Sequence, residues 1–108
     1  MVKTSTGVPR TGSSLKSPGD VKMGHTTVTT ATECVQVTTE TYAPNGIAFE
    51  VKDSATYYIS AHETAGTDLS GKGLVCKANN GVFIQCNDPS ILFVDAGGSS
   101  KTISWCIM

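Results

Sequence analysis

The sequence predicts an all-β protein: a small antiparallel β-sandwich or barrel of about seven short strands with an extended N-terminal arm. Three observations support this fold class. β-Branched residues, which favour strands over helices, dominate residues 26–42. Apolar and polar residues alternate with period 2 in much of the remaining chain, and turn residues recur roughly every 8–12 positions. No segment combines the length and the capping residues of a helix.

The N-terminal segment is expected to form the arm. Gly, Ser, Thr and Pro dominate residues 1–24, and the few apolar residues there follow neither a strand nor a helix period. Such a segment buries too little apolar surface to offset the entropy cost of ordering it, about 1–2 kcal/mol per residue. We therefore divide the chain into an extended Ser/Thr/Gly/Pro-rich basic arm, residues 1–24, and a compact β-domain, residues 25–108.

Charge separates the arm from the domain. The whole chain carries 8 Lys and Arg against 9 Asp and Glu, a net charge of −1. The arm has four cations and one acid, a charge of +3, which leaves −4 for the domain; the four cations are Lys3, Arg10, Lys16 and Lys22. We expect them to bind an acidic surface, either on a protein partner or on a neighbouring subunit. The alternative is a tail that only increases solubility.

The strands of the domain are expected in order along the chain. The Thr-rich run 26–42 suits the pleated surface of a sheet, and Pro44, Asn45 and Gly46 then form a turn. In the next run, apolar residues at 47, 49 and 51 alternate with polar or small ones, which is typical of a strand buried on one face. The further expected strands are residues 56–60, 74–78, 82–86, 91–94 and 102–107.

Asn79, Asn80 and Gly81 are expected to close a hairpin. A three-residue loop with Gly81 in the left-handed conformation pairs Cys76 with Ile84 and makes one face wholly apolar. A two-residue loop mixes polar and apolar residues on both faces. Because the buried face fixes the register of a strand, the three-residue loop is the preferred prediction.

The four cysteines, Cys34, Cys76, Cys86 and Cys106, have two interpretations. They pack in the core as free thiols, or they form two disulfides. In the preferred hairpin register Cys76 and Cys86 are diagonal neighbours, roughly 7–8 Å apart, so bridges would join them separately to Cys34 and Cys106. No charged and apolar leader follows Met1, which favours synthesis in a reducing cytosol and free thiols.

Two segments approach known motifs but lack a required residue. His62 and Glu63 begin like a zinc-protease helix, but Gly66 stands where the second histidine ligand belongs. The segment 66–73 approaches a phosphate-binding loop, but Gly73 replaces the Ser or Thr that binds magnesium. No two cysteines have the C-x-x-C spacing of a zinc or redox site. We therefore expect no cofactor and no metal.

Composition also argues against several classes of function. No serine lies in the G-x-S-x-G sequence of hydrolases, and His25 and His62 are the only histidines, so we expect a protein that is not an enzyme. The four cations of the arm lack neighbouring aromatic residues and precede an acidic domain, which argues against nucleic acid as a partner. The apolar runs are too short to span a membrane. Trp105 alternates with Ile103 and Ile107, so it belongs to the core or to a subunit interface.

The layout of the chain resembles the small head-decoration or cement proteins of tailed phages. The resemblance rests on the length, on the Ser/Thr/Pro-rich N-terminal arm and on the compact β-domain. It implies a non-enzymatic structural protein that is made in the host cytoplasm, forms homotrimers on the virion surface and grips its neighbours with the arm. The alternative is a secreted, disulfide-stabilised β-domain that binds a ligand, such as a lectin-like module or a host-directed effector.

Overall fold

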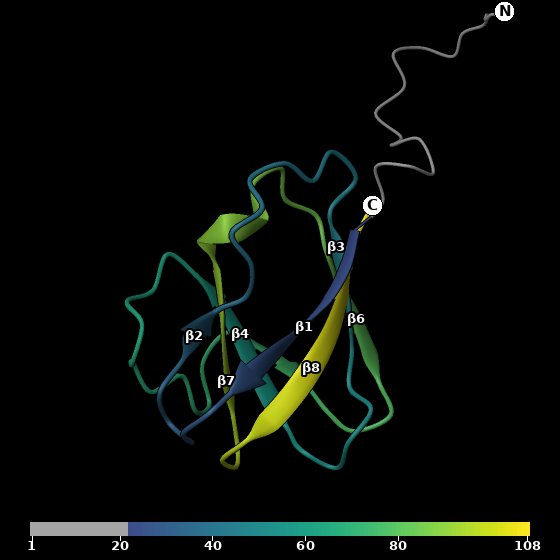
Figure 1. The fold of residues 1–108 in the computed structure, drawn as a ribbon. Coiled ribbons are helices and arrows are strands. Elements are labelled where there is room, and N and C mark those ends of the chain that lie inside the picture. Colours follow the sequence, from purple (N-terminus) through teal and green to yellow (C-terminus); the bar gives the residue numbers. More distant parts are fainter. Residues whose placement is uncertain (1–21) are drawn as a thin grey trace, which may run out of the picture.

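The computed structural model describes residues 22–108 as a β-sandwich of two four-stranded antiparallel sheets (Figure 1). The strands are β1 (Lys22–Val28), β2 (Val35–Gln36), β3 (Ile47–Glu50), β4 (Tyr57–Ala61), β5 (Leu74–Cys76), β6 (Gly81–Ile84), β7 (Leu92–Ala96) and β8 (Lys101–Ile107). The first sheet has the strand order β1-β8-β3-β6, and the second has the order β2-β7-β4-β5. The predicted all-β fold is confirmed, and its architecture is a sandwich.

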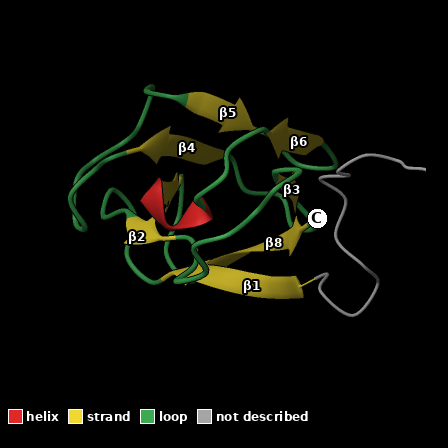
Figure 2. Ribbon diagram, turned by 90° about the horizontal axis from the view of Figure 1, so that it is seen from above, coloured by secondary structure: helices red, strands yellow, loops and turns green. Residues whose placement is uncertain are grey.

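The two sheets form separate layers, with β1 and β8 in one layer and β4 and β5 in the other (Figure 2). The core lies between them and is built from alternate residues of the strands, as period-2 patterning requires. Ile47 and Ile103 of the first sheet and Tyr57 and Val94 of the second are fully buried there. The alternation therefore identified which side chains face inward.

Strand β1 begins at Lys22, within the segment that the sequence assigns to the arm. It pairs with β8, so that Met23 lies opposite Cys106 and Gly24 lies opposite Trp105. Strand β8 lies at the opposite end of the chain, so the composition around residue 22 does not reveal this pairing. The Thr-rich run 26–42 likewise contains a turn, because β1 ends at Val28 and β2 is only two residues long.

The predicted hairpin at residues 79–81 is wrong. Strand β5 pairs with β4 and β6 pairs with β3, so the two strands belong to different sheets. The left-handed residue of the turn is Asn79, with φ of 62°, and not Gly81. Cys76 lies opposite Tyr57, and Ile84 lies opposite Ile47. Both residues face the core as expected, but the periodicity of a strand does not identify its partner.

Tyr57 connects the core to the end of the sandwich where β8 begins. Its hydroxyl lies 2.7 Å from Asp53 Oδ2 and 2.9 Å from the carbonyl oxygen of Thr102. Burial, together with the hydrogen bond to Asp53, raises the pKa of Tyr57 far above its ordinary value. The neighbouring Tyr58 is only half-buried, because it lies on the opposite face of β4.

All four cysteines are free thiols in the structure. Cys34 and Cys76 are buried, whereas Cys86 and Cys106 are half-buried. Burial raises the pKa of the Cys76 thiol, and burial with the nearby Asp88 raises that of Cys86. Both thiols therefore stay protonated at neutral pH, which makes them weak nucleophiles.

Candidate functional site

The outer faces of the two sheets differ in how far the chain covers them. On the second sheet, the loop of residues 62–73 packs over the part of the outer face around Asp95. Asp95 of β7 is fully buried there and accepts hydrogen bonds from Leu69 N at 2.9 Å and from Ala96 N at 2.7 Å. Leu69 is fully buried as well. The loop therefore removes Asp95 from solvent and pairs its carboxylate, whereas Val75 on the edge strand β5 of the same sheet stays exposed.

Cys34 fixes the same loop from the other side. Its amide donates to the carbonyl oxygen of Thr67 at 3.0 Å, and its own carbonyl accepts from Gly66 N at 2.8 Å. The thiol donates to the carbonyl oxygen of Thr64 at 3.3 Å. Cys34 and Leu69 lie outside the main core cluster and are buried by the loop. The segment from His62 to Gly73, which approaches two motifs in sequence, thus covers Asp95 and Cys34 in the structure.

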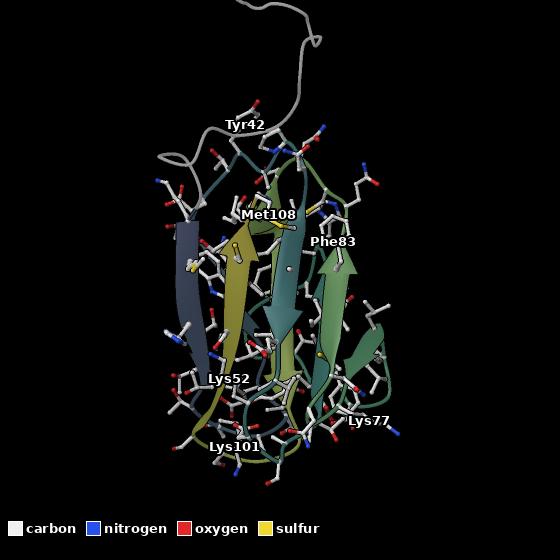
Figure 3. The ribbon with its side chains drawn as sticks, turned by 90° about the vertical axis from the view of Figure 1, so that its right-hand side faces the viewer. Tyr42, Lys52, Lys77, Phe83, Lys101 and Met108 are labelled. Carbon is white, nitrogen blue, oxygen red and sulfur yellow. The ribbon has the colours of Figure 1, made fainter. Side chains whose placement is uncertain are left out.

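Figure 3 shows the four strands of the first sheet side by side, with Phe83 on β6. The outer face of this sheet carries an apolar row that crosses all four strands. Met23 of β1 lies opposite Cys106 of β8, Cys106 lies opposite Ala48 of β3, and Ala48 lies opposite Phe83 of β6. The two large side chains stand at the ends of the row and are exposed, Met23 to 77% and Phe83 to 52%. Cys106 and Ala48, in the middle, are half-buried. We call Met23, Cys106, Ala48 and Phe83 the apolar row.

A polar row runs beside the apolar row, one step further along the strands. It consists of His25, Ser104 and Glu50, which lie opposite one another in register. Glu50 also forms an exposed ion pair with Lys52, whose Nζ lies 3.8 Å from Glu50 Oε1. An antiparallel sheet with one face in the core normally has a polar outer face. The polar row follows that rule, and the apolar row departs from it.

Between these rows lies an open groove of about 460 Å³. Its floor is β8 from Ser104 to Cys106, with β1 on one side and β3 on the other. The lining residues are Met23, Gly24, His25, Ala48, Phe49, Glu50, Lys52, Ser104, Trp105 and Cys106. The groove is thus apolar at its centre and charged along one border, which suits contact with an apolar side chain.

Trp105 contributes both to the core and to the groove. It is half-buried and packs against the core, and its Nε1 donates to Thr26 Oγ1 at 2.9 Å. The indole occupies the space beside Gly24, since a Cβ at that position would lie 2.9 Å from Trp105 Cε2. Glycine at position 24 therefore makes room for the ring. Trp105 is therefore a core residue that also lines the groove, and its role at an interface stays a prediction.

Phe83 is held in place by a second glycine. A Cβ at Gly46 would lie 2.7 Å from Phe83 Cζ, so the ring rests on the backbone at the start of β3. Gly46 has a φ of 95°, a conformation that glycine adopts without strain. The aromatic ring is therefore positioned although about half of it is exposed.

The charged residues that were predicted to bind a partner are only partly described. Lys22 lies in β1, where its Nζ is 3.2 Å from Glu40 Oε1. Lys3, Arg10 and Lys16 lie outside the described residues. The structure therefore gives Lys22 an acidic neighbour within its own chain.

The polar groups around the groove do not form a hydrogen-bonded relay. Within residues 22–108, no hydrogen bond joins the side chains of His25, Ser104, Glu50 and Cys106. In the same part of the chain, no three His, Cys, Asp or Glu side chains converge as metal ligands would. The described residues also include no helix long and apolar enough to cross a membrane.

The sequence indicated Trp105 as a core or interface residue and Cys106 as a core or disulfide cysteine, but it did not place Cys106 on this surface and gave no sign of the other members. Met23 was assigned to the arm, and the row joins residues from four strands that are far apart in the chain. Only the strand register brings Met23 and Phe83 to one face. Comparison with protein-family models, with curated proteins and with solved structures finds no match.

Proposed function

We propose that this protein is a non-enzymatic structural protein that assembles with copies of itself on a larger particle, in the manner of a phage capsid decoration protein. Its place of action is then the virion, after synthesis in the host cytoplasm. The observation that supports this function is the apolar row on the outer face of the first sheet. On the other outer face the loop of residues 62–73 buries Asp95, although Val75 on the edge strand β5 stays 44% exposed; on this one Met23 and Phe83 are exposed to a greater extent.

The apolar row favours association because exposed apolar surface is unfavourable in water. Burying a side chain the size of Met or Phe contributes roughly 1.5–3 kcal/mol. Met23 and Phe83 each expose more than half of their surface in the single chain, 77% and 52%. Together with the groove between them they form a continuous surface, and continuous apolar surface marks interaction sites on soluble proteins.

The basic arm supplies a second contact in this proposal. Its charge of +3 complements the −4 of residues 25–108. Several acids of the domain are exposed, among them Glu33 and Asp68. An arm that reaches a neighbouring subunit would find these carboxylates there, and the attraction would weaken as salt increases.

The molar mass of the full-length protein tests the proposal. We expect sedimentation velocity to show an oligomer at micromolar concentration that dissociates on dilution. Thiol alkylation tests which surface the copies use to associate. Because Cys106 lies in the apolar row, it should react more slowly in the concentrated sample than in the dilute one. Cys86 is the matched control, because it is also half-buried but packs against the core.

Two results would contradict the proposed function. One is a monomer throughout the accessible concentration range. The other is an oligomer in which Cys106 reacts equally fast at all concentrations, because the outer face would then remain open in the assembly.

A further inference from the structure

We infer that two copies of this chain pair through their outer faces about a two-fold axis that runs along β3 at Ala48, with Phe83 of each copy seated in the groove of the other. This inference rests on the proposed function and specifies its interface. It depends on the order of side-chain sizes across the apolar row and on the position of the groove.

The apolar row has large residues at its ends and small ones in the middle. Across the sheet the order is Met23, Cys106, Ala48 and Phe83. The groove lies over Cys106, two strands away from Phe83. One face therefore carries both a protruding aromatic ring and an open site for an aromatic ring, which is the requirement for a self-complementary contact.

A two-fold axis along β3 satisfies both sites at once. Rotation about this axis places β6 of each copy over β8 of the other copy. Each Phe83 therefore meets the second copy's Cys106, and each Ala48 meets the second copy's Ala48. Neighbouring strands are about 4.8 Å apart, so β6 with its ring and β8 with the groove floor are separated by roughly 10 Å. Because this separation is the same in both copies, both rings reach a groove at once. The contact is isologous, and it closes after two chains.

The same axis gives a role to Met23. Met23 lines the groove on the β1 side, so it would pack against the ring that enters from the second copy. Contact between a thioether and an aromatic ring is favourable. Ala48 on the axis allows the two sheets to approach to the usual distance of about 10 Å. Cys106, Ala48 and Phe83 are then buried, and Met23 borders the contact.

The charges near the axis balance in this arrangement. Glu50 and Lys52 follow Ala48 along the chain and already form an ion pair. Two copies bring two carboxylates and two ammonium groups together, with no net charge. His25 lies on β1, beyond the overlap of β8, β3 and β6, and stays at the rim. The interface thus buries no unpaired charge.

The alternative face-to-face arrangement is less well packed. An axis midway between β8 and β3 would place Phe83 against the second copy's Met23 and Cys106 against its Ala48. Large side chains would then meet large ones while the small ones faced each other across a gap. Cores lose stability in proportion to such gaps, so the axis along β3 is favoured.

Engineered cysteine pairs test the geometry directly in the full-length protein. In Phe83→Cys, a bifunctional thiol reagent long enough to cross the roughly 10 Å between facing sheets should link position 83 to the second copy's Cys106. A link within one chain would also span about 10 Å but would leave the protein at its monomer mass, whereas a link between copies gives a covalent dimer. In the double variant Ala48→Cys, Cys106→Ser, which keeps Phe83, the same reagent should link position 48 to its own equivalent. Non-reducing electrophoresis and peptide mass mapping identify the links.

Truncation of the ring gives an independent measurement. We expect Phe83→Ala to raise the Kd for self-association by roughly tenfold to a hundredfold, as for a central interface residue. The control is Val75→Ala, because Val75 is exposed to a similar extent, 44%, on a strand of the other sheet. Circular dichroism and thermal unfolding verify that both variants remain folded.

The outcomes separate this inference from the proposed function. A link between positions 83 and 83, a stable trimer, or an unchanged Kd in Phe83→Ala overturns the inference but leaves self-assembly in place. A monomer at every concentration overturns both. The predicted links together with a weakened Phe83→Ala variant support both.

Discussion

The indole of Trp105 lies beside the backbone of Gly24, its direct cross-strand neighbour, and donates a hydrogen bond to Thr26 on the same strand at 2.9 Å. The ring thereby replaces the side chain that position 24 lacks and covers the end of the core. An aromatic residue opposite a glycine is a known means of stabilising strand pairing. The pair also forms part of the groove wall, so its packing shapes the candidate site.

Gly24→Ala should destabilise the domain. The added Cβ would clash with the rigid indole, and overpacking of this kind costs about 1–3 kcal/mol. Urea unfolding followed by Trp105 fluorescence measures the change. Gly97→Ala is the control, because a Cβ there would meet only Thr56 O at 3.7 Å, an ordinary contact, and its stability should be nearly unchanged.

Asp95→Ala should release the loop of residues 62–73. The substitution leaves the amides of Leu69 and Ala96 without their acceptor, and each buried unpaired amide costs about 1–3 kcal/mol. We expect lower stability in urea and faster proteolysis within the loop. Glu33→Ala is the comparison, since Glu33 is an exposed acid outside the loop. Equal protease resistance of Asp95→Ala and the wild type would show that Asp95 does not hold the loop.

The pair of Tyr57 and Asp53 predicts pH dependence at both ends of the scale. For Asp53, burial acts to raise the pKa, but hydrogen bonds, first that from Tyr57, outweigh it and lower the pKa below 3.8. Its contribution to stability is therefore present above pH 3.8 and is lost as the pH falls through the folded value. Burial raises the pKa of Tyr57 above 10.0, so its contribution is present below that pH and is lost as the pH rises.

Tyr57→Phe tests this pair. The variant should be about 1 kcal/mol less stable at pH 7, and its stability should fall less steeply than that of the wild type towards acid and towards alkali. Urea midpoints at about pH 3, 7 and 10.5 measure the profile. Tyr58→Phe, on the opposite face of β4, should keep the wild-type profile. Parallel profiles for the wild type and Tyr57→Phe would contradict the assignment.

The arm should act through charge. Because Lys22 already has Glu40 as a neighbour, the informative variant changes Lys3, Arg10 and Lys16 to Glu and retains Lys22. We expect weaker self-association at low salt, and a smaller difference from the wild type near 1 M salt, where screening is effective over about 3 Å. Sedimentation at several salt concentrations measures it.

A charge-matched variant controls for net charge. Changing Lys72, Lys77 and Lys101 to Glu alters the total charge by the same amount but leaves the arm intact. If this variant weakens association equally, the effect belongs to overall repulsion and not to the arm.

The fold could be predicted from the sequence to the level of inward and outward residues. Alternation around Ile47 and around Trp105 identified strands whose bounds differ little from those of β3 and β8. The pairing of the strands could not be predicted, because the same alternation is compatible with any partner. Strands β5 and β6 pack their apolar faces into the core from two different sheets, and the turn residues between them do not indicate this.

The candidate site was less predictable for a related reason. Met23 and Phe83 each look like isolated apolar residues in polar surroundings, and such residues are common on protein surfaces. Their significance depends on the register that places Cys106 and Ala48 between them. That register is a property of the folded chain.

The loop of residues 62–73 has a consequence for stoichiometry. If both outer faces were open, copies could stack sheet upon sheet without limit, and the protein would form fibres. By covering the second sheet at Asp95, the loop leaves less open surface on that side, and two copies that pair through the apolar row present the more covered faces outward. The loop would thereby help to limit growth through this contact to two chains.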